Sequence, residues 1–414
     1  MAENMLEGLR ALDLTNEIGL LCGKILADLG VDVIKCEKPG GDPARNIPPF
    51  YHDTPGPENS LYWFAYNTNK RGITLNLETE KGRDIFRKLI KQTDFVIESY
   101  PPGYLKDLGL DYEAISRINP QVIMTSITPF GQTGPYADQK AYDLVINALG
   151  VQLSQYGDPD RAPIPIGVPQ AYMYAGASAA ESTMIAHYYR STTGEGQHVD
   201  ISAMESVIWT VVIGTLPRWD AWKLVVKRVG NRFSYGPHLT ENVWECKDGY
   251  ICYFIQGGEA GIRANKTLLE WMDHEGMAPD FMKEYDWDNF NLSKIDQSEL
   301  DRLADGIRPF FKKHTKDELV EGAVQRNIKL FKVADSADTL NNSQLKARDF
   351  WVNIDNEGWG ESITCPGEFA KFSEAPIGNF RRAPFIGEHN DEIYRQVLGL
   401  SQLELEDLKT DGTI

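Results

Sequence analysis

The sequence predicts an α/β protein in which a doubly wound, Rossmann-like parallel sheet forms a large domain, accompanied by a smaller α+β domain. Apolar segments with strand periodicity alternate with amphipathic helical segments through the early part of the chain. A hairpin signal replaces this alternation at residues 242–255. A chain of 414 residues, 42% of them hydrophobic, can bury the cores of more than one domain.

The early part of the chain supplies the parallel sheet. The helix expected at residues 80–92 places Ile85, Phe86 and Leu89 on one face, as an amphipathic helix covering a sheet requires. The turn after residue 15 lacks a G-x-G-x-x-G motif, which removes the main support for a nicotinamide or flavin site. Strands are expected at residues 9–15, 31–36, 73–77, 95–100 and 122–127, and helices at residues 19–29, 80–92, 104–118 and 142–149.

The later part of the chain changes character. Asp248 and Gly249 form a strong turn signal between two short strands, and Thr315 and Glu318 have the spacing of a helix capping box. Helices are expected at residues 205–222, with a break at Pro217, and at 261–272, 300–312 and 315–327. We expect three parts: residues 1–222 as the N-terminal part of the large domain, 223–330 as the small domain, and 331–414 as a segment that returns to the large domain.

Composition excludes several classes of function. The formal net charge of −18 argues against nucleic-acid binding, which needs clustered lysine and arginine. The five cysteines are scattered without metal-ligand spacing, which predicts reduced, buried thiols and no metal site. The N-terminal residues lack a signal-peptide pattern, and no window approaches a membrane span. We therefore expect a cytoplasmic protein that does not bind to a membrane.

The chain is organised around residues 165–202. A helix there carries small residues on one side, a glycine-rich turn at residues 193–196 ends it, and a short alternating strand follows at residues 197–202. A face this small allows another backbone or a bulky ligand to approach closely. The small residues are Ala175, Gly176, Ala177, Ala179 and Ala180.

This stretch resembles the class III CoA-transferases, the family of formyl-CoA:oxalate, carnitine and bile-acid CoA-transferases. That family has a G-x-P-x-A-D segment followed by an R-x-x-T-G-x-G-Q-x-V-D-x-S run. Tyr172 stands where the family carries its nucleophilic aspartate. The matching residues are Gly167, Pro169, Ala171, Ala175, Gly176, Arg190, Thr193, Gly194, Gly196, Gln197, Val199, Asp200 and Ser202.

The resemblance implies covalent catalysis by a carboxylate. In the family, the aspartate attacks an acyl-CoA thioester to give a mixed anhydride, and the CoA thiolate returns to form an aspartyl-CoA thioester. A phenol with an ordinary pKa of about 10 is mostly protonated at neutral pH and cannot form the same anhydride. We therefore expect a chain without its own nucleophile at Tyr172. The alternatives are an activated Tyr172 phenolate, or a displaced carboxylate such as Asp143 or Glu181.

The family likeness also implies where coenzyme A or acyl-CoA, as substrate, would bind; no tightly bound cofactor is expected. Asp107 and Glu78 depart from the family, which has cations there, so we expect CoA binding to be weakened, with Lys106 as a possible compensation. The alternative for Lys38 and Lys140 is that both are solvated surface lysines without a role in CoA binding. The predicted CoA-binding residues are Lys38, Leu75, Ser99, Tyr100, Lys140, Tyr142, Gly257 and Gly258.

Three functions follow from these expectations. Because family members form interlocked dimers, a chain without the aspartate fits the non-catalytic subunit of a heteromer, with a homologous aspartate-bearing CoA-transferase subunit as partner. The second is an active transferase, or an acyl-CoA isomerase that abstracts a proton. The third is a CoA-binding regulatory protein. His198, Asp200 and Ser202 do not predict a hydrolase triad, because the nucleophile elbow is absent.

Overall fold

The computed structural model describes residues 4–414 except 212–214, 236–237, 376 and 379. The chain divides into two compact units. The first unit comprises Met1–Leu153, Pro165–Leu224 and Lys346–Ile414, and the second comprises Ser154–Ile164 and Val225–Leu345. The domain boundaries expected at residues 222 and 330 stay predictions, because compactness does not test which parts fold independently.

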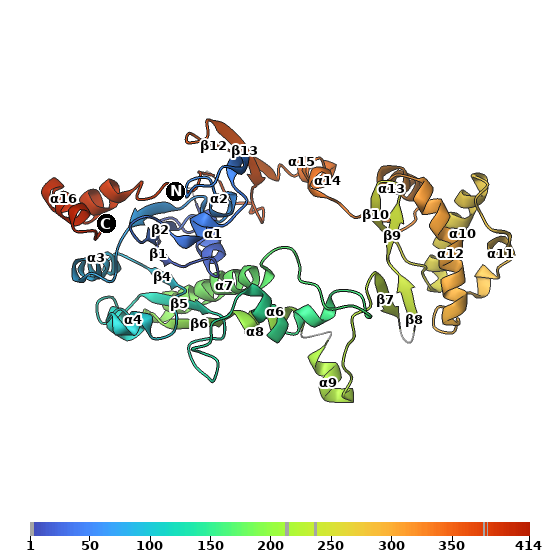
Figure 1. Ribbon diagram of the computed structural model, residues 1–414, viewed down its shortest axis with the longest axis horizontal. Coiled ribbons are helices and arrows are strands. Elements are labelled where there is room, and N and C mark those ends of the chain that lie inside the picture. Colours follow the sequence, from blue (N-terminus) through green and yellow to red (C-terminus); the bar gives the residue numbers. More distant parts are fainter. Residues whose placement is uncertain (1–3, 212–214, 236–237, 376, 379) are drawn as a thin grey trace. The chain divides into compact units, whose positions relative to one another are not determined.

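A six-stranded parallel sheet forms the centre of the first unit, with the order β3-β2-β1-β4-β5-β6 (Figure 1). In the register, Leu12 of β1 lies opposite Ile34 of β2 and Val96 of β4. The chain order reverses between β1 and β4, so the predicted doubly wound sheet is confirmed. The strands are β1 (Arg10–Leu14), β2 (Asp32–Glu37), β3 (Arg71–Thr74), β4 (Phe95–Glu98), β5 (Ile123–Thr128) and β6 (His198–Ser202).

Helices cover both faces of this sheet. On one face, the side chains of Leu12 and Val96 share a core with Phe86 of α3. On the other, Phe95 shares a core with Ala175 of α7. Alternate strand residues therefore feed two different cores. The helices of the first unit are α1 (Leu20–Asp28), α2 (Leu61–Asn67), α3 (Glu80–Ile90), α4 (Tyr104–Asp107), α5 (Tyr112–Ser116), α6 (Asp143–Leu149), α7 (Gln170–Thr193), α8 (Ala203–Val211), α9 (Leu216–Trp222) and α16 (Gln402–Thr410).

Two predicted helices differ from the structure. The helix expected at residues 104–118 is divided into α4 and α5, because Gly109 has a φ of +65° and the Asp111 side chain caps a new helix through the Ala114 N–H. The helix expected at residues 205–222 is described as α8 and α9. The residues between them, 212–214, lie outside the described part.

The small face of α7 packs on the backbone of α1. A Cβ added to Gly176 would lie 2.8 Å from the Leu21 Cβ and 3.2 Å from the Cys22 N, so glycine is required for this close approach. Gly194 ends the helix with a φ of +79°, and its N–H donates to the Arg190 carbonyl at 2.8 Å. The small residues thus anchor α7 against its neighbour and fix the position of its N-terminal turn.

The C-terminal segment protects the edge strand β3. The Gly72 N–H donates to His389 Nδ1 at 3.1 Å, and the Thr74 N–H donates to Asn390 Oδ1 at 2.9 Å. The Tyr394 hydroxyl donates to the Thr74 carbonyl at 2.5 Å. These contacts satisfy backbone groups that an exposed edge would leave open. The segment contains the hairpin β12 (Trp351–Asn356) and β13 (Glu361–Pro366), and the π-helix Glu392–Val397.

A buried cation holds together three segments of the first unit. Arg45 is fully buried, and its Nε and Nη2 donate to Glu37 at 2.6 and 2.7 Å. Its Nη1 donates to Glu58 at 2.7 Å, and its Nη2 also donates to the Pro384 carbonyl at 2.9 Å. The guanidinium carbon lies 4.0 Å from the centre of the Trp63 ring. The C-terminal segment is therefore tied to the loop after β2 through one side chain.

The second unit has its own core. Phe311 meets Trp244 and Tyr253 edge-on, each with ring centres 5.4 Å apart. The predicted hairpin at Asp248 and Gly249 and the Thr315–Glu318 capping box are both present. The strands are β7 (Arg232–Tyr235), β8 (His238–Glu241), β9 (Val243–Cys246), β10 (Gly249–Cys252) and β11 (Phe331–Lys332), and the helices are α10 (Gly258–His274), α11 (Asp280–Lys283), α12 (Gln297–Lys313), α13 (Lys316–Gln325), α14 (Ser336–Leu340) and α15 (Ser343–Ala347), the last reaching past the end of the unit.

Candidate functional site

A cavity of about 340 Å³ lies in the first unit where the strand order reverses. Residues 16–18, which follow β1, and 99–102, which follow β4, form part of its wall, and residues 137–142 and Tyr172 complete much of the rest. Open parallel sheets bind ligands at this place, beyond the carboxyl ends of the strands on either side of the reversal. We call it the switch-point cavity. It brings together the predicted site residues Ser99, Tyr100, Lys140, Tyr142 and Tyr172.

Tyr172 lies in the first turn of α7, and its phenol is a neutral group. The hydroxyl oxygen accepts a hydrogen bond from the Asp143 N–H at 3.2 Å. Burial, together with the negative charge of Glu17, raises the pKa of Tyr172 to about 12. At neutral pH only about one molecule in 10⁵ then carries a phenolate. The predicted alternative of an activated phenolate has no support from this geometry.

Asp143 is a helix cap. Its Oδ1 accepts from the Ala171 N–H at 2.7 Å, and its Oδ2 accepts from the Asn147 amide at 2.8 Å. These bonds hold the start of α7, while burial raises the pKa of the Asp143 carboxyl. Both oxygens are therefore engaged in shaping the helix mouth.

Glu181 lies too far along α7 to serve the cavity. It is exposed, and the nine residues that separate it from Tyr172 span about 13 Å along the helix axis. It lines a different, apolar groove together with Met184 and Phe372. Neither carboxylate expected as a substitute nucleophile is thus among the residues that line the switch-point cavity.

Two other carboxylates do line the cavity, Glu17 and Asp138. Sequence reasoning missed Glu17, although its position directly after β1 is the signal that could have found it. The negative charge of Glu17 contributes to the raised pKa of the Tyr172 phenol. Lys140, which is exposed, supplies a cation on the same wall. The cavity can therefore take a ligand with an apolar body, with Lys140 as the one lysine or arginine among its lining residues.

Lys38 is already paired. Its Nζ donates to Glu78 Oε1 at 2.6 Å, and both side chains are more than half exposed. Glu78 also accepts from the Tyr104 hydroxyl at 3.4 Å, and the Tyr104 ring lies 4.6 Å from that of Tyr100. Lys38, the predicted CoA contact, is thus in an ion pair with Glu78, one of the departures from the family. Tyr104 and Tyr100 connect this pair to the cavity wall.

The other predicted residues lie elsewhere. Leu75 is 3% exposed and belongs to the core, so its side chain is not available to a ligand. Asp107 and Lys106 are exposed neighbours in α4. Gly257 is the N-cap of α10 and Gly258 its first residue, both in the second unit. The roles of all these residues in CoA binding stay predictions.

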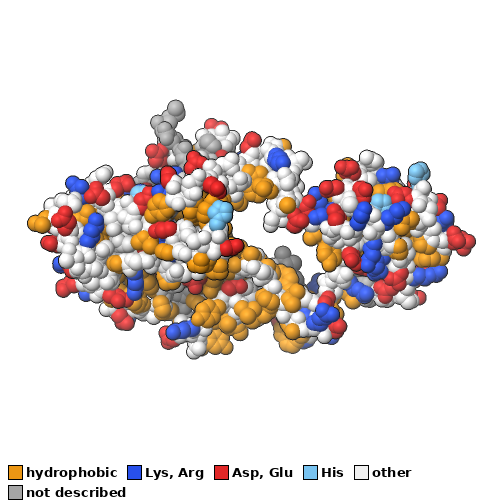
Figure 2. All heavy atoms as spheres, turned by 45° about the horizontal axis from the view of Figure 1, so that its top comes forward, with side chains coloured by type: hydrophobic (Ala, Val, Ile, Leu, Met, Phe, Trp, Pro, Cys, Tyr) orange, Lys and Arg blue, Asp and Glu red, His pale blue; other side chains and the backbone are white. Residues whose placement is uncertain are grey.

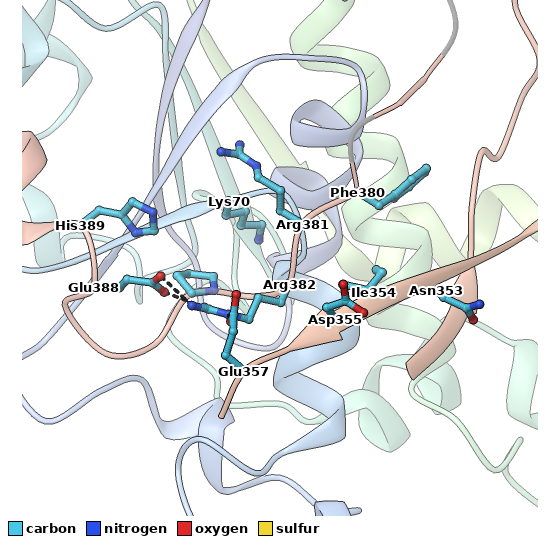
Figure 3. Close-up of a pocket in the computed structure, with 11 residues that line it drawn as sticks. Lys70, Asn353, Ile354, Asp355, Glu357, Phe380, Arg381, Arg382, Glu388 and His389 are labelled. Atoms are coloured by element: carbon cyan, nitrogen blue, oxygen red, sulfur yellow. Dashed lines mark hydrogen bonds and ion pairs between the residues drawn. The ribbon is translucent and has the colours of Figure 1, made fainter. Parts of the chain in front are cut away.

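A second cavity of the first unit, of about 330 Å³, is lined by charged groups that largely neutralise one another (Figure 3). Arg382 donates to both Glu388 oxygens at 2.7 Å and to Glu357 at 2.7 Å. The Lys70 ammonium donates to Asp13 at 2.8 Å. The balance of charge does not favour a phosphate here.

Comparison with known proteins identifies the chain. The fold defines an α/β protein with a ligand cavity at a topological switch point. The family model named CoA-transferase family III matches residues 6–390, and the chain belongs to that family. It is 34% identical over 416 residues to subunit BbsE of the succinyl-CoA:(R)-benzylsuccinate CoA-transferase of Thauera aromatica, covering 98% of this chain and 97% of that one.

Other similar proteins include further CoA-transferases and a solved structure. The formyl-CoA:oxalate CoA-transferase of Streptomyces avermitilis is 30% identical over 428 residues and covers 99% of each chain. The beta subunit of the succinyl-CoA–L-malate CoA-transferase of Chloroflexus aurantiacus is 28% identical, covering 99% of this chain and 98% of that one. Among solved structures, a CAIB/BAIF family protein from Brucella suis has a TM-score of 0.82 at 29% identity, covering 96% of this chain and all of that one. Members of this family use CoA thioesters as substrates.

Proposed function

We propose that this chain is the non-catalytic subunit of a heteromeric CoA-transferase, which exchanges CoA between an acyl-CoA donor and a carboxylic acid. The observation that carries the proposal is Tyr172, a protonated phenol in the first turn of α7, at the position of the family motif where a carboxylate is needed. Two relatives over nearly the full chain, BbsE and the malate transferase beta subunit, are named as subunits.

Exposed apolar side chains support a partner chain. Figure 2 shows hydrophobic side chains gathered over the first unit. Tyr188 of α7 is 73% exposed, Trp209 of α8 is 77% exposed, and Trp222 of α9 is 73% exposed. Large apolar side chains left exposed to this degree are typical of surfaces that bind a partner. We propose an interlocked dimer with a homologous subunit that bears the aspartate.

We also propose a cytoplasmic location. The five cysteines are free, as is usual in a reducing compartment.

The proposal is tested by purification from the native host and by activity of the separate chain. We expect the chain to copurify with a related subunit of similar mass, visible as a second species by intact-mass analysis. The chain produced alone is expected to transfer no CoA from succinyl-CoA to carboxylic acids, while the complex does. Transfer by the chain alone at a rate comparable to that of the complex would reject the proposal.

Glu17 favours a second candidate, an active transferase that uses a displaced carboxylate. Its side chain lines the switch-point cavity next to Tyr172, where an acyl group would lie. This candidate predicts that the chain alone turns over and that Glu17→Gln abolishes the turnover. The isomerase version predicts solvent deuterium in an acyl-CoA substrate. The regulatory alternative predicts CoA binding without either reaction.

We also propose that CoA binds weakly to this chain because Glu78 occupies Lys38. Glu78→Lys removes the carboxylate and adds a cation near the expected nucleotide. We expect the Kd for CoA to fall about tenfold, which corresponds to about 1.4 kcal/mol of binding free energy. Titration calorimetry would measure the change. Asp84→Lys, at an exposed residue of α3 paired with Arg87, makes the same change of net charge and is the control, with little expected effect. An equal Kd in the wild type and Glu78→Lys would place the nucleotide elsewhere.

A further inference from the structure

A buried carboxyl group supports the wall of the switch-point cavity from behind. Glu98 is the last residue of β4 and is 4% exposed. One of its oxygens, Oε2, accepts from the Tyr100 N–H at 2.7 Å. Tyr100 and its neighbours at residues 99–102 line the cavity. The wall at residues 99–102 is therefore held in part by a hydrogen bond to Glu98, beside the bonds between Ser99 and Asn16.

A chain of hydrogen-bonding groups leads from Glu98 to the surface. Ser126, 1% exposed, is the register partner of Glu98 in the neighbouring strand, and its hydroxyl lies close enough to lower the pKa of the Glu98 carboxyl. Ser126 Oγ lies 2.8 Å from His198 Nε2. His198 is exposed and its ring stacks on Tyr112, with the centres 5.8 Å apart. Ser126 and His198 therefore lie in sequence between the buried carboxyl and the surface.

The charges around this chain are acidic. Asp200 of β6, the register partner of Ser126, faces both Glu98 and His198. Asp111, the N-cap of α5, also faces His198, and Glu195 faces Tyr112. On the cavity side, burial raises the pKa of the Tyr100 phenol, and smaller contributions come from Tyr104, Cys36, Glu98 and Asp42. Among the described residues, no lysine or arginine forms an ion pair with Glu98.

Burial, reinforced by Asp200, raises the pKa of Glu98 to about 7, although the bonds from Ser126 and Tyr100 act in the opposite direction. The carboxyl group therefore changes its charge within the neutral pH range. A charged carboxylate accepts a stronger hydrogen bond from an N–H than a neutral acid does. In openings of residues 99–102 that leave Glu98 buried, the bond from the Tyr100 N–H is consequently stronger above neutral pH than below it.

We propose that Glu98 is a positioning residue for the switch-point cavity, whose charge sets how firmly residues 99–102 are held, and that Ser126 and His198 carry its proton to and from solvent. In the neutral state, the Glu98 O–H donates to Ser126 Oγ, the Ser126 O–H donates to His198 Nε2, and His198 Nδ1 carries a proton. On ionisation, the Glu98 proton moves to Ser126, the Ser126 proton moves to His198 Nε2, and the Nδ1 proton leaves to solvent. One proton is released in total, and no bond between heavy atoms changes.

The cavity's assignment as a CoA site rests on the proposed function, but the test needs no ligand. Amide hydrogen exchange of the peptide that contains Tyr100 is measured by mass spectrometry from about pH 5.5 to about pH 8.5, corrected for intrinsic exchange. For the wild type we expect the protection factor to rise several-fold, with a midpoint near the Glu98 pKa. Glu98→Gln, whose side chain has no charge to change, is expected to give a flat profile.

Two further variants separate positioning from simple structural support. Ser126→Ala removes a donor to the ionised carboxylate, so the midpoint is expected to move to higher pH by about one unit. Glu113→Gln, an exposed residue of α5, is the control and is expected to keep the wild-type profile. A flat wild-type profile, or a wild-type profile in a folded Glu98→Gln variant, would overturn the proposal. CoA transfer by the wild-type chain alone, together with an intact profile, would instead count against the proposed function alone.

Discussion

Tyr172→Asp is expected to let the isolated chain form a covalent CoA adduct that the wild type does not form. The aspartate is ionised at neutral pH, whereas the phenol is ionised in about one molecule in 10⁵, so the labelling rate is expected to rise by at least about 10³. The adduct would be measured by intact mass after incubation with succinyl-CoA, and its position by hydroxylamine trapping and peptide mapping.

Tyr172→Asn is the matched control for this experiment. Asparagine has the size of aspartate and, like it, removes the phenol oxygen that accepts from the Asp143 N–H, so both variants perturb the helix mouth equally. We expect no adduct on the asparagine variant. An adduct on the wild-type chain or on Tyr172→Asn would show that another residue is the nucleophile. A folded but unlabelled Tyr172→Asp would show that this position does not meet the thioester.

Arg45→Met is expected to lower the free energy of unfolding of the first unit by about 3–5 kcal/mol. The substitution leaves the buried Glu37 carboxylate without its cation, and the desolvated charge is what makes the loss large. It also removes the bonds to Glu58 and to the Pro384 carbonyl that fix the C-terminal segment. Urea denaturation followed by fluorescence would measure the change.

Arg87→Met provides the comparison. Arg87 forms an exposed ion pair with Asp84 at 2.7 Å, so its removal is expected to cost less than about 0.5 kcal/mol. Adding Glu37→Gln to Arg45→Met removes the unpaired charge and is expected to recover part of the lost stability. A loss of less than about 1 kcal/mol for Arg45→Met would mean that the structure relaxes to hydrate Glu37.

Much of the fold was predictable because it follows from local periodicity. Apolar runs of strand length, separated by amphipathic helices, specify a parallel sheet, and the topological rules for such sheets place Ser99 and Tyr100 at a ligand site. Tyr172 was found from its position in a family motif. The break between α4 and α5 was missed because the left-handed conformation of Gly109 cannot be distinguished from an ordinary glycine in sequence.

What could not be predicted depends on contacts between distant residues. Lys38 and Glu78 are 40 residues apart, and only the pairing of β2 with β3 brings the loops that carry them together. The role of Asp143 as the cap of α7 joins residues 28 positions apart. Glu98 ends a strand that is otherwise apolar in sequence, and its raised pKa arises from burial and from Asp200, which is 102 residues away in the chain.

The most direct measurement of the central claim is the location of the covalent intermediate in the native complex. The complex would be incubated with succinyl-CoA, trapped with hydroxylamine during turnover, and both subunits mapped by mass spectrometry. We predict a hydroxamate on an aspartate of the partner subunit and none on this chain. A hydroxamate on Glu17, Asp143 or any other residue of this chain would contradict the account.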